Sequence, residues 1–461
     1  MAVFSTIQKS QLEGAKRLDA EYYQPEYLLL NEKLRKQKIK LLDELAFITD
    51  GIHASIDYDP DSNIRCFSAQ APKDNYFESV EQFMSEKQHN VNKRTALKIG
   101  DVLLSSVGTI GNAAVVDQSM LPANADRHVG IIRLHNNQLI SPYFLSTFLN
   151  SKYGRFQSVR ESTGNVQLNL FIDKIKTFVV PCPNVAQIQE VDKIAADAFQ
   201  ERGKAEDFYS QAEKVLLGKL GLEDFEAGGE LWNVVNLSKV KKASRMDAEY
   251  FQPKFQDVIE KIEKYSIGWK FLEDLTTFIN NGVQPPYSEN GEVRFFSQKW
   301  IGDKSIDYSF LTADNEPRVS KSFFEEKKNK PYLVKKNDIL YYSVGANLGY
   351  CHNYLESEDI AIGSFINLIR ADATKIDPIF LGFCLNSVVG RMQAERDKSG
   401  LAQPYIYAKN LRKFKIPIVR KDTQQRIAEL VRESHEAQKQ AKQLLEEAKR
   451  KVEELIEKPA K

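Results

Sequence analysis

An eleven-residue segment near the start of the chain returns almost unchanged in its middle. Arg17–Tyr27 reads RLDAEYYQPEY, and Arg245–Phe255, 228 residues later, reads RMDAEYFQPKF. Seven of the eleven positions are identical, and three of the other four exchange side chains of similar shape, Leu for Met once and Tyr for Phe twice. A match of this length at one offset predicts two copies of one module, related by approximate symmetry.

The pairing continues through most of both copies. The offset grows from 228 to 237 and settles at 236, so insertions fall mainly between residues 65 and 101, where we expect surface loops. The paired segments are Asp50–His53 with Asn281–Gln284, Ile64–Ser68 with Val293–Ser297, Asp101–Gly108 with Asp338–Gly345, Phe148–Ser151 with Cys384–Ser387, Ser162–Gln167 with Lys398–Gln403, and Pro181 with Pro417.

The composition indicates a globular protein of the cytoplasm. The chain has 461 residues, 42% of them hydrophobic, and a formal charge of +1, which suits two to four domains and excludes a polycation. It contains no apolar run near twenty residues and no features of a signal peptide, so we expect no membrane partner. Four scattered cysteines predict reduced buried thiols and no zinc site.

Each copy combines two kinds of sequence. The first is mixed, with short β-branched and aromatic runs between Gly, Asn and Asp turns and a few helices such as Pro142–Tyr153 and Pro378–Gln393. It predicts an α+β domain with a twisted, mostly antiparallel sheet. The second is helical, with small and apolar residues at alternating spacings of three and four, as in a coiled-coil seam.

The two helical segments are of equal length, about 33 residues or roughly 50 Å. Because the chain must reverse direction between the copies, we expect them to pair as an antiparallel coiled coil that separates two pseudo-two-fold-related modules. Two independent amphipathic helices are the alternative. The predicted seam, where partner helices would also dock, comprises Ile188, Val191, Ala195, Ala198, Ala205, Ala212, Leu216, Ile427, Leu430, Ala437, Ala441, Leu444, Ala448, Val452 and Leu455.

The alternation of these two kinds of sequence predicts four segments. Residues 1–183 form the first mixed domain with an N-terminal segment, and residues 184–230 form the central helix and a linker. Residues 231–421 form the second mixed domain, and residues 422–461 form the C-terminal helix that pairs with the central one.

Catalytic motifs are scarce in this sequence. It has no GxxxxGK[ST] phosphate loop, no GxGxxG after a strand, and neither HExxH nor GxSxG. Gln284-Pro-Pro-Tyr287 is similar to the Pro-Pro-aromatic loop of amino-group methyltransferases, although that loop normally begins with Asp, Asn or Ser. A rigid turn is the favoured interpretation, and a self-sufficient DNA adenine methyltransferase that uses this loop is the alternative.

Binding residues, by contrast, are frequent on the turn-rich stretches of both copies. Arg and Lys neutralise phosphates, while Arg, Asn and Gln read base edges, so together these residues predict a DNA surface. Each one taken singly is an ordinary surface residue. The predicted contacts are His53, Arg65, Lys73, Lys93, Arg94, Thr109, Arg127, Asn165 and Gln167 in the first copy, and Gln284, Arg294, Lys299, Arg318, Lys321, Asn347, Gln403 and Tyr405 in the second.

The whole chain resembles the specificity subunit of type I restriction-modification systems, the S or HsdS-like subunit. The resemblance is carried by two ordered sets of motifs, each ending in a long helix. They are Asp19–Pro25 and Asp247–Pro253, Gly51 and Gly282, the strands Gly100–Leu104 and Asn337–Tyr341, the loops Gly164–Gln167 and Gly400–Gln403, and the steps from Pro181 to Gln187 or Gln189 and from Pro417 to Gln424 or Gln425.

The resemblance implies a non-catalytic protein that works through partners. Each target-recognition domain would read one half of a split, asymmetric double-stranded DNA target, and the coil would set the distance between the halves. The chain would carry two methyltransferase subunits and the restriction (translocase) subunits, and it would bind no cofactor itself, S-adenosylmethionine, ATP and Mg²⁺ residing on those partners. A symmetric scaffold that grips proteins instead of DNA is a further alternative.

Overall fold

The computed structural model divides the chain into two compact units. The first unit comprises residues 1–203 and 438–461, and the second unit comprises residues 204–437. The structure describes residues 4–15, 17–78, 82–135, 139–164, 167–225, 232–313, 316–400 and 402–458. Each unit is described by itself below.

The first unit is built on an antiparallel sheet in the order β2-β7-β4-β5. A parallel pair, β3-β6, and a short antiparallel pair, β1-β8, accompany it. The strands are β1 Ile39–Leu41, β2 Ala46–Asp50, β3 Arg65–Phe67, β4 Val102–Ser105, β5 Ala113–Val115, β6 Ala123–Ala125, β7 Val129–Leu134 and β8 Val179–Pro181.

The second unit repeats this plan strand for strand. Its antiparallel sheet has the order β10-β16-β13-β14, its parallel pair is β11-β15, with β12 added at the edge, and its short pair is β17-β9. The strands are β9 Trp269–Phe271, β10 Thr276–Asn281, β11 Val293–Phe296, β12 Arg318–Val319, β13 Ile339–Tyr342, β14 Cys351–Asn353, β15 Ile360–Ile362, β16 Ile366–Ala371 and β17 Lys415–Pro417.

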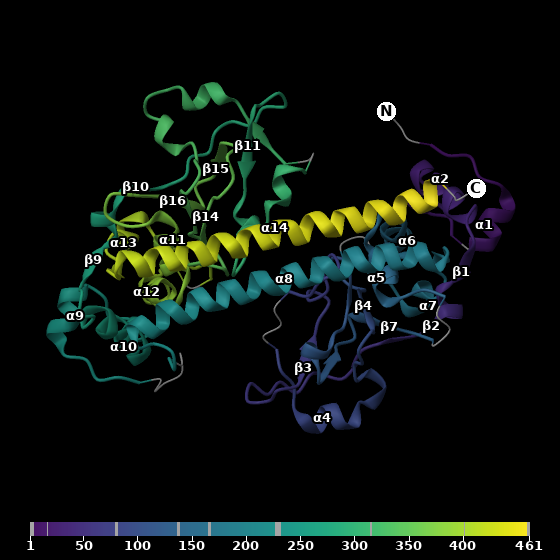
Figure 1. Cartoon of the computed structure of the whole chain (residues 1–461), viewed down its shortest axis with the longest axis horizontal. Helices are drawn as coiled ribbons and strands as arrows, with labels where there is room; N and C mark the ends of the chain where they lie inside the picture. Colours follow the sequence, from purple (N-terminus) through teal and green to yellow (C-terminus); the bar gives the residue numbers. More distant parts are fainter. Residues whose placement is uncertain are drawn as a thin grey trace. The chain divides into compact units, whose positions relative to one another are not determined.

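The helices also follow the repeat (Figure 1). A pair of consecutive helices, α5-α6 in the first unit and α11-α12 in the second, covers the sheet, and each pair contributes buried Phe and Leu residues to the core. The α-helices are α1 Lys9–Ala15, α2 Pro25–Arg35, α3 Leu42–Leu45, α4 Glu86–Val91, α5 Pro142–Asn150, α6 Lys152–Glu161, α7 Ile172–Ile175, α8 Val185–Leu220, α9 Leu237–Ala243, α10 Pro253–Glu263, α11 Pro378–Asn386, α12 Val388–Asp397, α13 Ala408–Leu411 and α14 Lys421–Glu457.

The repeated opening motif anchors the N-terminal segment of each unit. Arg17 donates to both carboxylate oxygens of Asp19 at 2.6 and 2.7 Å, and its guanidinium carbon lies 5.0 Å from the centre of the Tyr22 ring. Arg160 of α6 covers the same ring at 4.0 Å. Burial, followed by the hydrogen bond to Glu161, raises the pKa of Tyr22 to about 12. The conserved Arg, Asp and Tyr of the repeated motif therefore have a structural role: they hold one tyrosine ring between two guanidinium groups.

The second unit keeps the same arrangement. Arg245 donates to both oxygens of Asp247 at 2.8 and 2.6 Å, and Tyr250 lies between Arg245 and Arg396, at 4.9 and 5.1 Å from the ring centre. The same contacts are thus formed in both units, each with residues of its own unit. We infer that the motif stabilises the fold of each module.

The Asp of each predicted Asp-Val/Ile-Leu strand forms a buried ion pair with the next strand of the sheet. Arg133 of β7 donates to Asp101 at 2.7 and 2.6 Å and to the carbonyl of Ala96 at 3.1 Å. The side chain of Asp101 is 1% exposed, and its hydrogen bonds raise the pKa of Arg133. In the second unit Arg370 of β16 pairs with Asp338 at the same distances.

The two long helices pair in an antiparallel manner within each unit. In the first unit Lys451 of α14 contacts Glu190 of α8 at 2.5 Å. In the second unit the hydroxyl of Ser434 donates to the carbonyl of Ala205 at 2.7 Å. Because the partner number on α14 falls as the number on α8 rises, the two helices run in opposite directions, as predicted.

The seam follows the predicted stripe with two differences. Thirteen of the fifteen predicted seam residues are buried, including every alanine. Near the end of α14, however, Leu445 and Ile456 are buried while Leu444 and Leu455 are only half-buried. The buried positions there recur about every 3.7 residues on average, closer to the 3.6 of a straight helix than to a strict heptad.

The structure confirms the predicted fold class of two tandem mixed modules, mostly antiparallel sheet and an antiparallel helix pair. The long helices begin at Val185 and Lys421, next to the predicted boundaries. Among the residues that the structure describes, no helix has the length and apolar character needed to cross a membrane.

The Asp–Arg pair predicts a large stability effect that is easy to observe in the second unit, which contains all three tryptophans. Asp338→Asn leaves the guanidinium of Arg370 without its counter-charge, and we expect a loss of about 3 kcal/mol in the free energy of unfolding. Urea denaturation followed by tryptophan fluorescence measures it. The exposed Asp359→Asn is the control and should change the value by less than about 0.5 kcal/mol; equal effects of the two substitutions would contradict the assignment.

Candidate nucleic-acid interface

A glycine after the first long strand of each unit permits an unusually close approach of two backbones. A Cβ on Gly51 would lie 2.1 Å from the carbonyl oxygen of Asp126 and 2.2 Å from that of Ala125. A Cβ on Gly282 would lie 2.4 Å from the carbonyl oxygen of Gly363. No side chain fits at such distances, so both positions require glycine, and the loops on either side are brought together.

In the first unit this approach gathers four loops at one end of the sheet, which we call the first loop cluster. Ile52 donates to the carbonyl of Ala125 at 2.8 Å, which joins residues 50–53 to residues 126–128. Ser106 then donates to the carbonyl of His128 at 3.0 Å, and Gly108 donates to that of Leu168 at 3.1 Å. Residues 106–109 and 167–169 complete the cluster, which places His53, Thr109, Arg127 and Gln167 on connected loops.

One carboxylate organises the charged side chains of this cluster. His53 lies 2.5 Å from one oxygen of Asp50, and Arg94 lies 3.3 Å from the other. Arg94 comes from the 3-10 helix Lys93–Thr95 and also donates to Thr49. The side chains of His53 and Arg94 are 65% and 51% exposed, so both polar ends are held in place and remain accessible to a ligand.

A second pair lies beside the first. His128 approaches the carboxylate of Asp126 at 3.3 Å, and Arg127 donates to His128 at 3.2 Å. Sequence reasoning selected Arg127 but missed His128. The repeat supplies the signal that could have identified this position. At the shared offset of 237, His128 corresponds to Phe365, and each lies between two strands of its copy.

The second unit forms the corresponding second loop cluster from residues 281–284, 363–365, 343–347 and 402–405. Gly282 donates to the carbonyl of Ile366 at 2.8 Å, Ser343 to that of Phe365 at 3.1 Å, and Gly345 to that of Pro404 at 2.8 Å. The predicted contacts Gln284 and Gln403 are exposed on the first and last of these loops, and Asn347 and Tyr405 are half-buried on the third and last.

Two aromatic side chains are exposed at this second cluster, and one of them, Tyr407, corresponds to the 61% exposed Phe171 of the first unit. Phe365 is 56% exposed, and Tyr407, just beyond the cluster, is 47% exposed. The rings of Tyr405 and Tyr407 meet edge to face at 4.8 Å, and the hydrogen bond with Tyr407 raises the pKa of Tyr405. Sequence reasoning missed Phe365 and Tyr407, because an exposed ring is indistinguishable from a core ring without the fold.

The Gln284-Pro-Pro-Tyr287 loop lies at the rim of the second cluster. Gln284 donates to the hydroxyl of Tyr287 at 3.2 Å, and the Tyr287 ring packs edge to face on Phe295 at 5.2 Å. Its side chains thus contact each other, in keeping with the predicted rigid turn.

The remaining predicted DNA contacts lie outside the two clusters, and most have partners within their own unit. Asn165 is outside the described residues. These contacts stay predictions: Arg65 donates to Ser119, Lys73 pairs with Glu78, Lys93 with Asn90, Lys299 with Glu316 and Arg294 with Glu358, Arg318 donates to Gly291, and the backbone N–H of Lys321 donates to Glu292.

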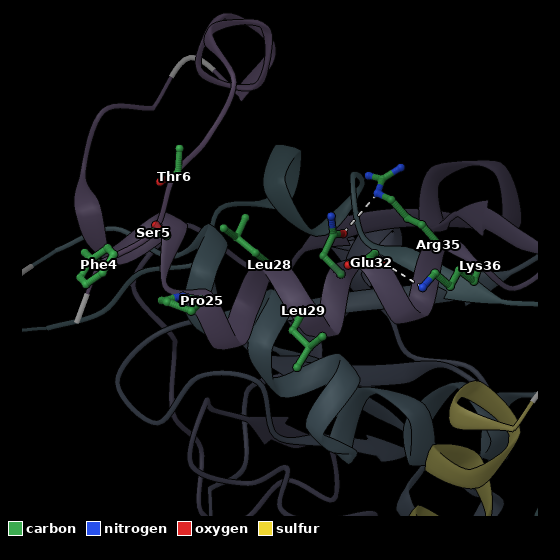
Figure 2. A pocket seen from close by; sticks show the side chains of 10 residues that line it. Phe4, Ser5, Thr6, Pro25, Leu28, Leu29, Glu32, Arg35 and Lys36 are labelled. Carbon is green, nitrogen blue, oxygen red and sulfur yellow. Dashed lines mark hydrogen bonds and ion pairs between the residues drawn. The ribbon is translucent and has the colours of Figure 1, made fainter.

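A shallow groove of about 680 Å³ lies between the N-terminal segment and α2 of the first unit (Figure 2). Phe4, Leu28 and Leu29 supply its apolar lining, and Arg35 and Lys36 lie at one end. The repeat places Gln256 and Asp257 where the two leucines lie. The two leucines that line the groove are therefore not repeated in the second copy, whereas the loop clusters are common to both.

Comparison with known protein families gives the assignment. The family model described as "Type I restriction modification DNA specificity domain" matches residues 65–202 and 267–450, one stretch in each copy of the repeat. The chain belongs to this family. Its function is therefore DNA target specificity, as a subunit that acts in a complex with other subunits and DNA, and the family role is not a catalytic one.

Comparison with solved structures finds chains that align with nearly the whole length of this one. The S subunit of a type I restriction-modification system from M. genitalium is 13% identical, covers 91% of this chain and 95% of its own, and has a TM-score of 0.43. The HsdS subunit from Thermoanaerobacter tengcongensis is 15% identical, with 92% and 97% covered and a TM-score of 0.30. A search of curated proteins finds no match.

A third solved chain comes from a study described as the structural basis of complex assembly and conformational transition of the type I R-M system. It is 16% identical, covers 92% of this chain and 98% of its own, and has a TM-score of 0.28.

The close backbone approach predicts that Gly51→Ala and Gly282→Ala each separate two loops of a cluster. We expect a loss of roughly 1 to 3 kcal/mol in the free energy of unfolding, because the added methyl group overlaps backbone atoms. Gly203→Ala is the matched control. Gly203 lies within α8, no described heavy atom lies within 4 Å of its added Cβ, and a gain of about 0.5 to 1 kcal/mol is expected. Equal effects at all three sites would refute the role of the approach.

Proposed function

We propose that this chain reads a split, asymmetric double-stranded DNA target, with one half-site bound by each unit through its loop cluster. The observation that carries the proposal is the pair of clusters themselves. In a chain of the DNA specificity family, they share two equivalent backbone hydrogen bonds, those of Ser106 and Ser343 and those of Gly108 and Gly345, and they differ in most of their exposed side chains. Shared backbone supports a shared task, and different side chains support two different half-site sequences.

The exposed groups in the clusters suit base-edge and phosphate contacts. A guanidinium such as that of Arg94 or Arg127 pairs with guanine or a phosphate, and amides such as Gln167, Gln284 and Gln403 pair with adenine. Because the whole chain carries a formal charge of only +1, we expect the isolated protein to bind DNA weakly and the assembled complex to bind it tightly.

The proposed partners are two methyltransferase subunits and, in the full assembly, restriction subunits that translocate DNA. Methylation of a base requires that the base leave the helix, and the methyltransferase partner would supply the pocket and S-adenosylmethionine. ATP and Mg²⁺ would be bound by the restriction partner. This chain would contribute target choice and the surface on which the partners assemble.

The exposed face of α8 is the proposed surface for a methyltransferase helix. Phe199 is 38% exposed on this helix, while its neighbour Ala198 faces the seam and is 1% exposed. Lys193 and Gln200 are exposed on the same helix, so an apolar ring stands among polar groups. An aromatic anchor in a polar surround is typical of helix docking surfaces.

The proposed function predicts a specific methylation pattern. In a host that expresses this chain with its methyltransferase, single-molecule sequencing should reveal methylated adenines in a split motif that disappears when the chain is deleted. Exchange of residues 20–180 for those of a relative should change one half of the motif and leave the other intact. If an active methyltransferase marks no motif with this chain, the proposal fails and a protein-binding scaffold is favoured.

If the exposed face of α8 binds the methyltransferase, a substitution on this face should weaken assembly. Phe199→Glu places a carboxylate in the proposed apolar contact, and we expect the dissociation constant for the methyltransferase to rise by about tenfold or more. Analytical ultracentrifugation or calorimetry of the purified subunits measures it. Val159→Glu introduces the same charge at a 43% exposed position on α6 and should leave the constant unchanged. Unchanged assembly by the Phe199 variant would remove this face from the interface.

A further inference from the structure

The two loop clusters occupy equivalent positions, which permits a residue-by-residue comparison of their chemistry. Gly51 and Gly282 make the same close approach, and Ser106 and Ser343 donate to the carbonyls of His128 and Phe365. These backbone contacts set the correspondence without reference to side chains. Asp50 then corresponds to Asn281, His53 to Gln284, Arg127 to Ser364, and His128 to Phe365.

The position of Arg94 can be matched in the same way. Arg133 and Arg370 donate to the carbonyls of Ala96 and Leu333, at 3.1 and 3.3 Å. Counting back two residues from each carbonyl equates Arg94 with Pro331. The Asp50–Arg94 ion pair of the first cluster is thus replaced by an amide and a proline in the second.

All ionisable groups at these matched positions belong to the first cluster. Asp50, His53, Arg94, Arg127 and His128 give way to Asn281, Gln284, Pro331, Ser364 and Phe365, and Asp126 gives way to Gly363. Nearby, Lys409 lies 5.2 Å from the Tyr407 ring centre, and Arg412 donates to the carbonyl of Ile279.

In the second cluster the exposed ring of Phe365 takes the place of His128, whereas the position of Tyr407 carries an exposed ring in both units, because its counterpart Phe171 is 61% exposed. Phe365 is 56% exposed, Tyr287 is 58% exposed and Tyr407 is 47% exposed. Large apolar side chains that remain this exposed at a binding surface contribute by stacking on bases or by entering between base steps. Such contacts release no counterions, whereas every cation that neutralises a phosphate releases counterions and adds to the salt dependence of binding.

On these grounds we propose that the two units read their half-sites by different physical means. The first unit uses charged side chains, chiefly Arg94 and Arg127, held in place by the carboxylates of its loops. The second unit lacks these charges and uses exposed aromatic and amide side chains, chiefly Phe365, which replaces His128, together with Tyr407. This inference rests on the proposed function, because it presupposes that each cluster contacts DNA.

The salt dependence of DNA binding distinguishes contacts made by charged side chains from contacts made by aromatic side chains. The measurement is the affinity of the complex of this chain with its methyltransferase for a duplex that carries its own methylation motif, over a range of salt concentrations. For Arg94→Gln with Arg127→Gln, we expect the slope of log K against log salt to fall in magnitude by about 1 to 2. For Phe365→Ala with Tyr407→Ala, we expect a loss of about tenfold at every salt concentration with the slope unchanged.

Matched controls remove the same kinds of group elsewhere in each unit. Arg35→Gln removes a guanidinium from exposed α2 of the first unit, and Phe271→Ala removes a 37% exposed ring from β9 of the second. Neither should change the affinity or the slope. Because all the substituted side chains are substantially exposed, retained assembly with the methyltransferase verifies that each variant is folded.

The outcomes distinguish this inference from the proposed function. If the unaltered complex shows no sequence preference, the proposed function itself fails. If the unaltered complex is sequence-specific, the inference is overturned when both pairs of substitutions change the slope equally, when the aromatic pair alone changes it, or when neither pair affects binding. A reduced slope for the arginine pair together with a constant loss for the aromatic pair supports the inference.

Discussion

The buried ion pair between Asp101 and Arg133, repeated as Asp338 and Arg370, is the contact on which the rest of each unit depends. It joins the first residue before β4 to the far part of β7, at the end of the sheet where Val102 pairs with Ile132. A one-residue slip of these strands would turn every side chain to the opposite face. The ion pair therefore fixes the register, and the opposite end of the same strands, near Ser105 and Val129, carries the loop cluster.

The two ends of the sheet therefore have different roles within each unit. At one end of the sheet a buried ion pair holds the strands, and at the opposite end backbone hydrogen bonds common to both units join the loops, so that the exposed side chains there can vary. Gly51 and Gly282 preserve those contacts by excluding side chains from them. This arrangement allows most exposed residues of a cluster to change, as they do between the two copies, without loss of the fold.

The helix pair illustrates how far periodicity alone can be used. The spacing of small and apolar residues predicted both helices and most of the seam, and the reversal of the chain between the copies predicted their antiparallel pairing. It missed the change near the end of α14, where Leu445 and Ile456 are buried in place of Leu444 and Leu455. A heptad pattern assumes 3.5 residues per turn, whereas this stretch packs on the core of its own unit with the period of a nearly straight helix.

The sequence by itself determined the repeat, the mixed class of each module, the motifs with a structural role and the family resemblance, because these depend on identities and spacings along the chain. Only the tertiary structure decided which polar residues gather in one place. Arg94 joins His53 through Asp50 although 41 residues separate them, whereas Arg65 and Lys73 lie outside the cluster. The structure also revealed Phe365 and Tyr407 as exposed rings. Both results depend on long-range backbone contacts and on burial, which local sequence patterns do not encode.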